Sequence, residues 1–202
     1  MIKAIIFDFG NVICRFTNEI FLEKVSKLNG KSRDENFELI YKNSGLPKKF
    51  ETGLISANDF YDQISKLLEL NISFEGMQEI YTKDKFTPIE GMDKLIESLK
   101  KNYKIGLLSN TSEWDFNCEM KKFPIMNLFD TITISNEVKA MKPNKVIYFD
   151  ALKKLELKPE ECVYVDDILE YVEAGKNLGI NSVQFINIDS FITELIKFGV
   201  KI

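Results

Sequence analysis

The apolar and polar positions divide the chain into stretches of different periodicity. Residues 4–7, Ala-Ile-Ile-Phe, form an unbroken apolar run that stops at Asp8, and Gly10-Asn11 then break it. A short apolar run rich in Ile is typical of a strand buried on both faces, as in a parallel sheet. From Pro88 onward, runs of this kind alternate with helical patterns, and strands are predicted at 104–108, 131–134, 162–165 and 182–185. The alternation predicts an α/β fold, a parallel sheet with helices on both faces.

The stretch from residue 15 to residue 85 has helical spacing and lacks strand signals. Phe21, Val25 and Leu28 fall at i, i+4 and i+7, and two further helices are predicted after Ser56 and over 74–83. This stretch separates the first predicted strand from the second by far more than the roughly 30 residues of a βαβ unit. We therefore expect a core formed by residues 1–14 and 86–202, with residues 15–85 inserted as a small helical cap.

Polar residues follow the ends of several predicted strands. They are Asp8 after the first, Ser109-Asn110 after the second, Lys142 after the third and Asp166-Asp167 after the fourth. Each group alone is explained as a helix cap or a solvated charge. Together they indicate a binding site, because ligands of open α/β sheets bind outside the carboxyl ends of the strands. The topology therefore predicts that these side chains share one crevice.

Composition removes several classes of function. The chain has 202 residues, no histidine and a net charge of −4. The missing histidine excludes His-based triads and the usual His-containing zinc sites, and the weak acidic charge argues against nucleic acid or an anionic membrane as partner. We expect no signal peptide or membrane span, three cysteines that are reduced, and a cytoplasmic location.

The remaining residues suit phosphoryl transfer. An aspartate such as Asp8 can attack phosphorus and form an aspartyl-phosphate. A second carboxylate could hold Mg²⁺ against the phosphate's negative charge, while Ser109 and Lys142 could stabilise the oxygens of the transferring group.

The four groups together resemble the motifs of the haloacid dehalogenase-like superfamily of hydrolases, along nearly the whole chain. The motifs are Asp8-Phe9-Gly10-Asn11-Val12, Leu108-Ser109-Asn110-Thr111, Lys142-Pro143 and Val165-Asp166-Asp167, and their D-x-G-N-V form is most similar to bacterial sugar-1-phosphate phosphatases. The resemblance implies a Rossmann-like core, a helical cap and Mg²⁺-dependent hydrolysis of a small phosphorylated metabolite. It implies that Asp8 is the nucleophile and that Ser109, Asn110 and Lys142 bind phosphate. Mg²⁺ would be held by Asp8, the Gly10 carbonyl and Asp167, with Asp166 and Asn11 in support.

Three positions depart from the family pattern. Gly10 stands where most phosphatases of the superfamily carry a second Asp as general acid, whose help is worth about 10²–10⁴-fold. Ile168 and Tyr171 stand where a small polar residue and an Asp or Asn are common. Slow turnover, or a substrate with a good leaving group such as an anomeric or acyl phosphate, is therefore expected.

The predicted cap contains an E-x-G-x-I-S stretch that begins at Glu51. Glu51 is a candidate substitute acid or specificity residue, and a solvated glutamate at a helix end is the alternative. Two other functions stay open from sequence. One is a metal-independent 2-haloacid dehalogenase, whose first motif usually has an aromatic residue at the place of Gly10; the other is a non-catalytic binding module of the same fold. The sequence does not identify the substrate or the oligomeric state.

Overall fold

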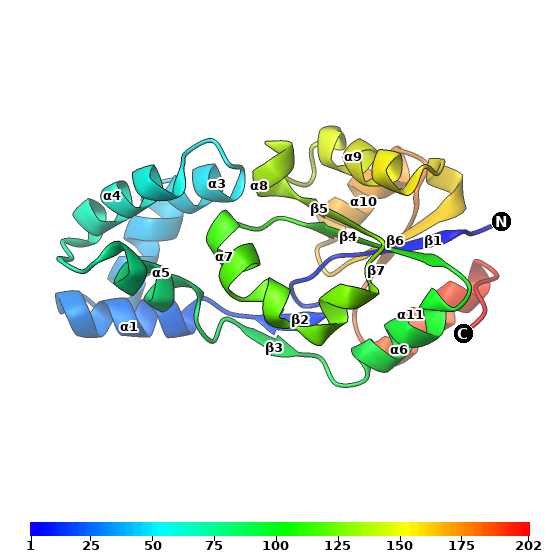
Figure 1. The fold of residues 1–202 in the computed structure, drawn as a ribbon, viewed down its shortest axis with the longest axis horizontal. Helices are drawn as coiled ribbons and strands as arrows, with labels where there is room; N and C mark the ends of the chain where they lie inside the picture. The colour runs from blue at the N-terminus through cyan, green and yellow to red at the C-terminus, as the bar shows by residue number, and fades with distance from the viewer.

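The computed structural model describes all of residues 1–202, and its centre is a five-stranded parallel sheet (Figure 1). The strands lie in the order β5-β4-β1-β6-β7, with every neighbouring pair parallel. This confirms the predicted fold class, and the strands begin and end within one residue of the predicted ranges. Their bounds are β1 Ala4–Phe7, β4 Lys104–Ser109, β5 Thr131–Ile134, β6 Cys162–Asp166 and β7 Asn181–Gln184.

Helices cover both faces of this sheet, and strand β1 shows why. Successive side chains of a strand point to opposite faces. Ile5 and Phe7 accordingly enter one apolar core, with α6 (Met92–Lys100) and α11 (Ile188–Lys197), while Ala4 and Ile6 enter another, with α9 (Lys145–Leu155). The strand is buried on both sides, as its unbroken apolar run predicts. The remaining helical segments around the sheet are α7 (Glu113–Cys118), η2 (Met120–Lys122), η3 (Pro124–Leu128), α8 (Ser135–Val138), η4 (Pro159–Glu161) and α10 (Leu169–Asn177).

A helical lobe, residues 19–82, projects from one end of the sheet (Figure 1). Its apolar core is rich in aromatic rings, among them the stacked pair Phe50 and Phe60, and Trp114 of α7 inserts into it from the sheet side. The lobe therefore packs on α7 as well as on itself. It contains α1 Glu19–Asn29, α2 Arg33–Phe37, η1 Glu38–Asn43, α3 Leu46–Glu51, α4 Ala57–Leu68 and α5 Phe74–Thr82.

The two connections between the lobe and the sheet pair with each other. Strand β2 (Cys14–Phe16) runs antiparallel to β3 (Phe86–Pro88), and Phe9, Phe16 and Phe86 pack ring against ring beside them. This small sheet is absent from the sequence-based prediction. Strands of three residues are too short to show an alternating pattern, and only Cys14 of β2 is buried.

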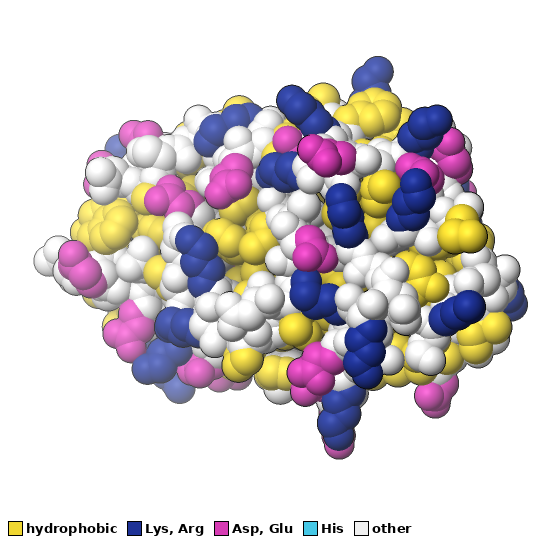
Figure 2. Space-filling view, turned by 45° about the vertical axis from the view of Figure 1, so that its right-hand side comes forward, with side chains coloured by type: hydrophobic (Ala, Val, Ile, Leu, Met, Phe, Trp, Pro, Cys, Tyr) yellow, Lys and Arg dark blue, Asp and Glu magenta, His cyan; other side chains and the backbone are white.

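The surface carries charges of both signs. On the face that Figure 2 shows, lysine and arginine side chains are interspersed with acidic ones.

No helix of the structure has both the length and the apolar character needed to cross a bilayer.

Candidate active site

The carboxyl ends of the strands bring the predicted polar residues to one place. Asp8 follows β1, Ser109 ends β4 and Asp166 ends β6. Lys142 reaches them from the segment between α8 and α9: its Nζ lies 2.5 Å from Asp8 Oδ1 and 2.6 Å from Asp166 Oδ2. The side chains of Asp8, Lys142 and Asp166 are almost completely buried. Lys142 and Asp8 thus form a buried ion pair although they lie 134 positions apart in the sequence.

Lys142 is held firmly in this position. Its ammonium group has three N–H donors, and they go to Asp8, Asp166 and the Leu108 carbonyl oxygen at 3.3 Å. Its backbone is fixed by Asn110, whose side-chain oxygen accepts from Lys142 N at 2.8 Å and whose Nδ2 donates to Lys142 O at 3.2 Å. Asn110 therefore positions the lysine through its side-chain amide.

The two neighbouring aspartates Asp166 and Asp167 have different surroundings. Asp166 is fully buried and accepts hydrogen bonds from the Lys142 ammonium, the Tyr164 hydroxyl and the Ile168 backbone N–H. Asp167 is only partly buried, lines the pocket described below and accepts a single hydrogen bond at 3.1 Å from Asn11 Nδ2. The carboxylate of Asp166 is thus hydrogen-bonded within the protein, whereas Asp167 keeps oxygens available to a ligand.

The three aspartates form an oxygen cluster that suits a divalent cation. One carboxylate oxygen from each of Asp8, Asp166 and Asp167 lies within 4.8 Å of the other two. Burial raises the pKa of Asp8 to about 7 against the lowering effect of Lys142, and the charge of Asp166 adds to the rise. Burial also raises the pKa of Asp167. One ammonium does not balance three carboxylates, and a hard divalent cation with oxygen ligands would supply the missing charge.

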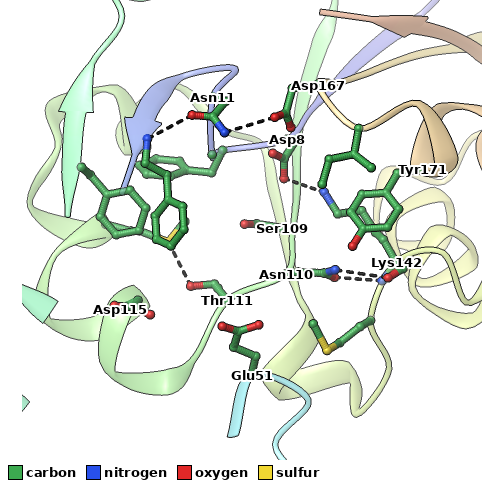
Figure 3. A pocket seen from close by; sticks show the side chains of 17 residues that line it. Asp8, Asn11, Glu51, Ser109, Asn110, Thr111, Asp115, Lys142, Asp167 and Tyr171 are labelled. Atoms are coloured by element: carbon green, nitrogen blue, oxygen red, sulfur yellow. Dashed lines mark hydrogen bonds and ion pairs between the residues drawn. The ribbon is translucent and has the colours of Figure 1, made fainter. Parts of the chain in front are cut away.

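These residues open into a pocket of about 200 Å³ between the sheet edge and the helical lobe (Figure 3). Asp8, Asn11 and Asp167 lie at one end of it, Ser109 and Thr111 border its middle, and Glu51 lies across the pocket from Asp8 (Figure 3). The full lining is Asp8, Phe9, Gly10, Asn11, Phe16, Glu51, Phe86, Ser109, Asn110, Thr111, Asp115, Met120, Met141, Lys142, Asp167, Ile168 and Tyr171. Of the nine residues named as site candidates from sequence, only Asp166 lies behind this lining.

Gly10 leaves open space next to the first aspartate. A Cβ built on Gly10 would lie 3.9 Å from Asp8 Oδ2, so any side chain at this position would project beside that carboxylate. No such group exists here. Ile168 and Tyr171 both line the pocket, and the Tyr171 ring centre lies 5.2 Å from Lys142 Nζ. The tyrosine therefore covers the lysine with an aromatic face instead of offering it an amide or a carboxylate.

Glu51, at the end of α3, is partly buried and is directed into the pocket (Figure 3). Burial and the charge of Asp115 raise its pKa to about 7, against the opposing effect of Lys85. Lys85 and Asp115 form a buried ion pair of 3.0 Å next to it.

Sequence reasoning missed several contributors to this site. Tyr164 follows the alternation of β6, two residues before Asp166, and this spacing is the one signal that places its hydroxyl near that carboxylate. Asp115 resembles an ordinary capping residue, because Ser112 caps α7 through the Asp115 backbone N–H. The pairing of Lys85 with Asp115 depends on how the lobe packs on α7, which no local pattern encodes.

Comparison with known proteins agrees with this arrangement. The chain is similar to a D-ribitol-5-phosphate phosphatase of Bacteroides thetaiotaomicron, with 29% identity over 91% of this chain and 92% of the relative. It is also similar to a phosphorylated carbohydrates phosphatase of Thermotoga maritima, with 24% identity over 90% of this chain and 83% of the relative.

A solved structure shares the fold over the same length. It is a haloacid dehalogenase-family enzyme from Bacteroides thetaiotaomicron in complex with magnesium and inorganic phosphate, with a TM-score of 0.83 and 22% identity over 95% of this chain and 99% of that one. The family model of the haloacid dehalogenase-like hydrolases matches residues 5–185. The chain therefore belongs to the haloacid dehalogenase-like hydrolase family.

Proposed function

We propose that the protein is a Mg²⁺-dependent phosphatase that hydrolyses a small phosphorylated metabolite through an aspartyl-phosphate at Asp8. The observation that carries this proposal is the cluster of Asp8, Asp166 and Asp167 around one buried ammonium, open to a pocket at the carboxyl edge of the sheet. Three carboxylates repel a halide, so the cluster favours a phosphate substrate with a cation over a 2-haloacid. The names of the two relatives, both phosphatases of phosphorylated carbohydrates, support a sugar or polyol phosphate.

Asp8 and Asp167, with the Gly10 carbonyl, are the groups proposed to hold Mg²⁺. When bound, the cation offsets the negative charge of the phosphoryl oxygens and lowers the pKa of the Asp8 carboxyl, so that it is ionised at neutral pH. Asn11 keeps Asp167 oriented through its 3.1 Å hydrogen bond. Asp166 acts from behind, by holding Lys142 against Asp8.

Asp8 attacks phosphorus with a carboxylate oxygen, which forms an acyl phosphate and breaks the bond from phosphorus to the leaving-group oxygen. That oxygen takes up a proton from solvent and leaves as an alcohol. Water then attacks phosphorus, releases inorganic phosphate and restores the carboxylate. Lys142 stabilises charge on the phosphoryl oxygens, and its longest hydrogen bond, 3.3 Å to the Leu108 carbonyl, is the one that a phosphoryl oxygen replaces most easily. Ser109, whose side chain faces the pocket, and Asn110 complete the phosphate site.

The helical lobe is proposed to be the cap that shields this reaction, with residues 15–85 as the inserted unit. The pocket lies between it and the sheet, with Glu51 on the lobe side. Exclusion of bulk water strengthens the electrostatic interactions in the pocket.

The test is a screen of phosphorylated metabolites with Mg²⁺, run on the wild-type protein beside Asp8→Asn. The proposal expects phosphate release from at least one sugar, polyol or acyl phosphate, loss of turnover when Mg²⁺ is chelated, and no turnover by Asp8→Asn. Activity that persists in Asp8→Asn or without a divalent cation would overturn the mechanism. Metal-independent halide release from a 2-haloacid would assign the dehalogenase reaction instead.

A further inference from the structure

Glu51 is held in place by backbone contacts between the lobe and α8. Its carbonyl oxygen accepts a 2.6 Å hydrogen bond from Ser135 Oγ, and the same hydroxyl oxygen accepts from the Thr111 backbone N–H at 2.9 Å. Two residues later, Gly53 has a φ of +67°, and a Cβ built on it would lie 2.2 Å from the Asn136 carbonyl oxygen. Only glycine permits this approach. The E-x-G spacing therefore anchors the backbone of Glu51 against α8, and the Ser135 hydroxyl links it to Thr111, the residue after Asn110.

The side chain of Glu51 has no partner of its own in the protein. Its carboxylate makes no hydrogen bond and no ion pair, although it is partly buried and faces the pocket across from Asp8 (Figure 3). The nearby ammonium of Lys85 is occupied by Asp115, at 3.0 and 3.4 Å from its two carboxylate oxygens, and lies over the ring of Tyr81. Its acceptor oxygens are therefore available to a hydrogen-bond donor that enters the pocket.

The charges that line the pocket restrict what that donor can be. Four carboxylates line it, those of Asp8, Glu51, Asp115 and Asp167, against the single ammonium of Lys142. Lys142 is already bound to two carboxylates at the sheet end. A leaving group with its own negative charge therefore meets no free cation at the lobe end. A hydroxylated, uncharged leaving group meets an acceptor.

We propose that Glu51 is a specificity-determining residue: its carboxylate accepts hydrogen bonds from the hydroxyl groups of an uncharged polyol or sugar and repels leaving groups that carry a negative charge. The inference rests on the proposed phosphatase function and deepens it. We therefore expect the good substrates to be phosphate monoesters of neutral polyols and sugars. Pyrophosphate and bisphosphorylated compounds should be poor substrates.

The test compares kcat/KM for three substrates: ribitol 5-phosphate, with a neutral hydroxylated leaving group; pyrophosphate, with an anionic one; and acetyl phosphate, with a small one that has no hydroxyl. The variants are Glu51→Gln, which keeps the shape and removes the charge, and Glu51→Ala. Glu38→Gln is the matched control, because Glu38 is an exposed glutamate of the same lobe that lies outside the pocket. Each variant is assayed beside wild type with Mg²⁺ at pH 8.

Glu51→Gln is expected to lower the ratio of ribitol 5-phosphate to pyrophosphate turnover by about 10-fold or more, since a hydrogen bond to a charged group is lost and a repulsion is removed. Part of this change must be a rise in pyrophosphate kcat/KM, and the loss for ribitol 5-phosphate must appear in KM. Glu51→Ala shifts the ratio in the same direction, and Glu38→Gln leaves it as in wild type.

The outcomes separate this inference from the proposed function. If the wild-type protein turns over ribitol 5-phosphate but the Glu51 variants keep the wild-type ratio, the specificity role is wrong and the phosphatase function stands. Turnover of acetyl phosphate but not of ribitol 5-phosphate by wild type likewise overturns the specificity role and leaves the phosphatase function standing. A fall in kcat for ribitol 5-phosphate without a gain for pyrophosphate also contradicts it, because that pattern belongs to a general acid. If wild type turns over none of the three substrates nor any other phosphate ester, the proposed function itself fails.

Discussion

Glu51 also makes a prediction for stability, which can be tested without any substrate. The folded protein holds the proton of this carboxyl until about pH 7, whereas its ordinary pKa is 4.5. The folded state therefore binds more protons than the unfolded state between these values, so stability falls as the pH rises through them. One pKa unit corresponds to about 1.4 kcal/mol, so the ionised carboxylate destabilises the protein by at most about 3.5 kcal/mol above pH 7.

Glu51→Gln removes this cost, because glutamine does not ionise. We expect the variant to be within about 1 kcal/mol of wild type at pH 5 and about 3.5 kcal/mol more stable at pH 8, as an upper bound for a group that is only partly buried. The measurement is the free energy of unfolding in guanidinium chloride at both pH values, in metal-free buffer. Glu38→Gln, at an exposed position, should follow wild type. If wild type and Glu51→Gln change in parallel with pH, the carboxylate is not desolvated and the account of this end of the pocket is wrong.

Three further substitutions test the framework around the site. Lys85→Met leaves Asp115 buried without its cation and should lower the free energy of unfolding by about 3–5 kcal/mol; urea titration checks this, and a change below about 1 kcal/mol contradicts it. Gly53→Ala places a Cβ against a carbonyl of α8 at a positive φ, so it should destabilise the protein by about 1–3 kcal/mol. It should also weaken the selectivity for ribitol 5-phosphate over pyrophosphate, as Glu51→Gln does. An unchanged melting temperature in calorimetry would refute the close approach of Gly53 to α8. Asn110→Ala removes both hydrogen bonds to the Lys142 backbone and should lower kcat by at least about 10-fold while the fold persists in circular dichroism; wild-type kcat would show that the lysine needs no such support.

The sheet could be predicted from the sequence because its strands are buried on both faces. An unbroken apolar run that ends at a polar residue marks such a strand, and β1, β4 and β6 all follow that pattern. The sheet-edge rule then brings Asp8, Ser109 and Asp166 to one edge without knowledge of any contact. Strands β2 and β3 could not be predicted, because they pair only through the return of the chain from the helical lobe.

The lobe end of the pocket was the least predictable part. Asp115 and Lys85 look like surface charges in sequence, and their burial comes from the packing of α7 against the lobe. Glu51 stands in a recognisable stretch, but its direction depends on the contacts of Gly53 and Ser135 with neighbouring segments. Such contacts join residues far apart in sequence, so periodicity carries no information about them.

In the proposed mechanism Asp8 forms a covalent bond to phosphorus, and this bond can be trapped chemically. Acid quenching during turnover of acetyl phosphate with Mg²⁺, followed by borohydride reduction, converts an aspartyl-phosphate into homoserine, which peptide mass spectrometry locates. Homoserine is expected at position 8 in the wild-type protein and not in Asp8→Asn. Turnover with unmodified Asp8, or with the modification at Asp166 or Asp167, would contradict it.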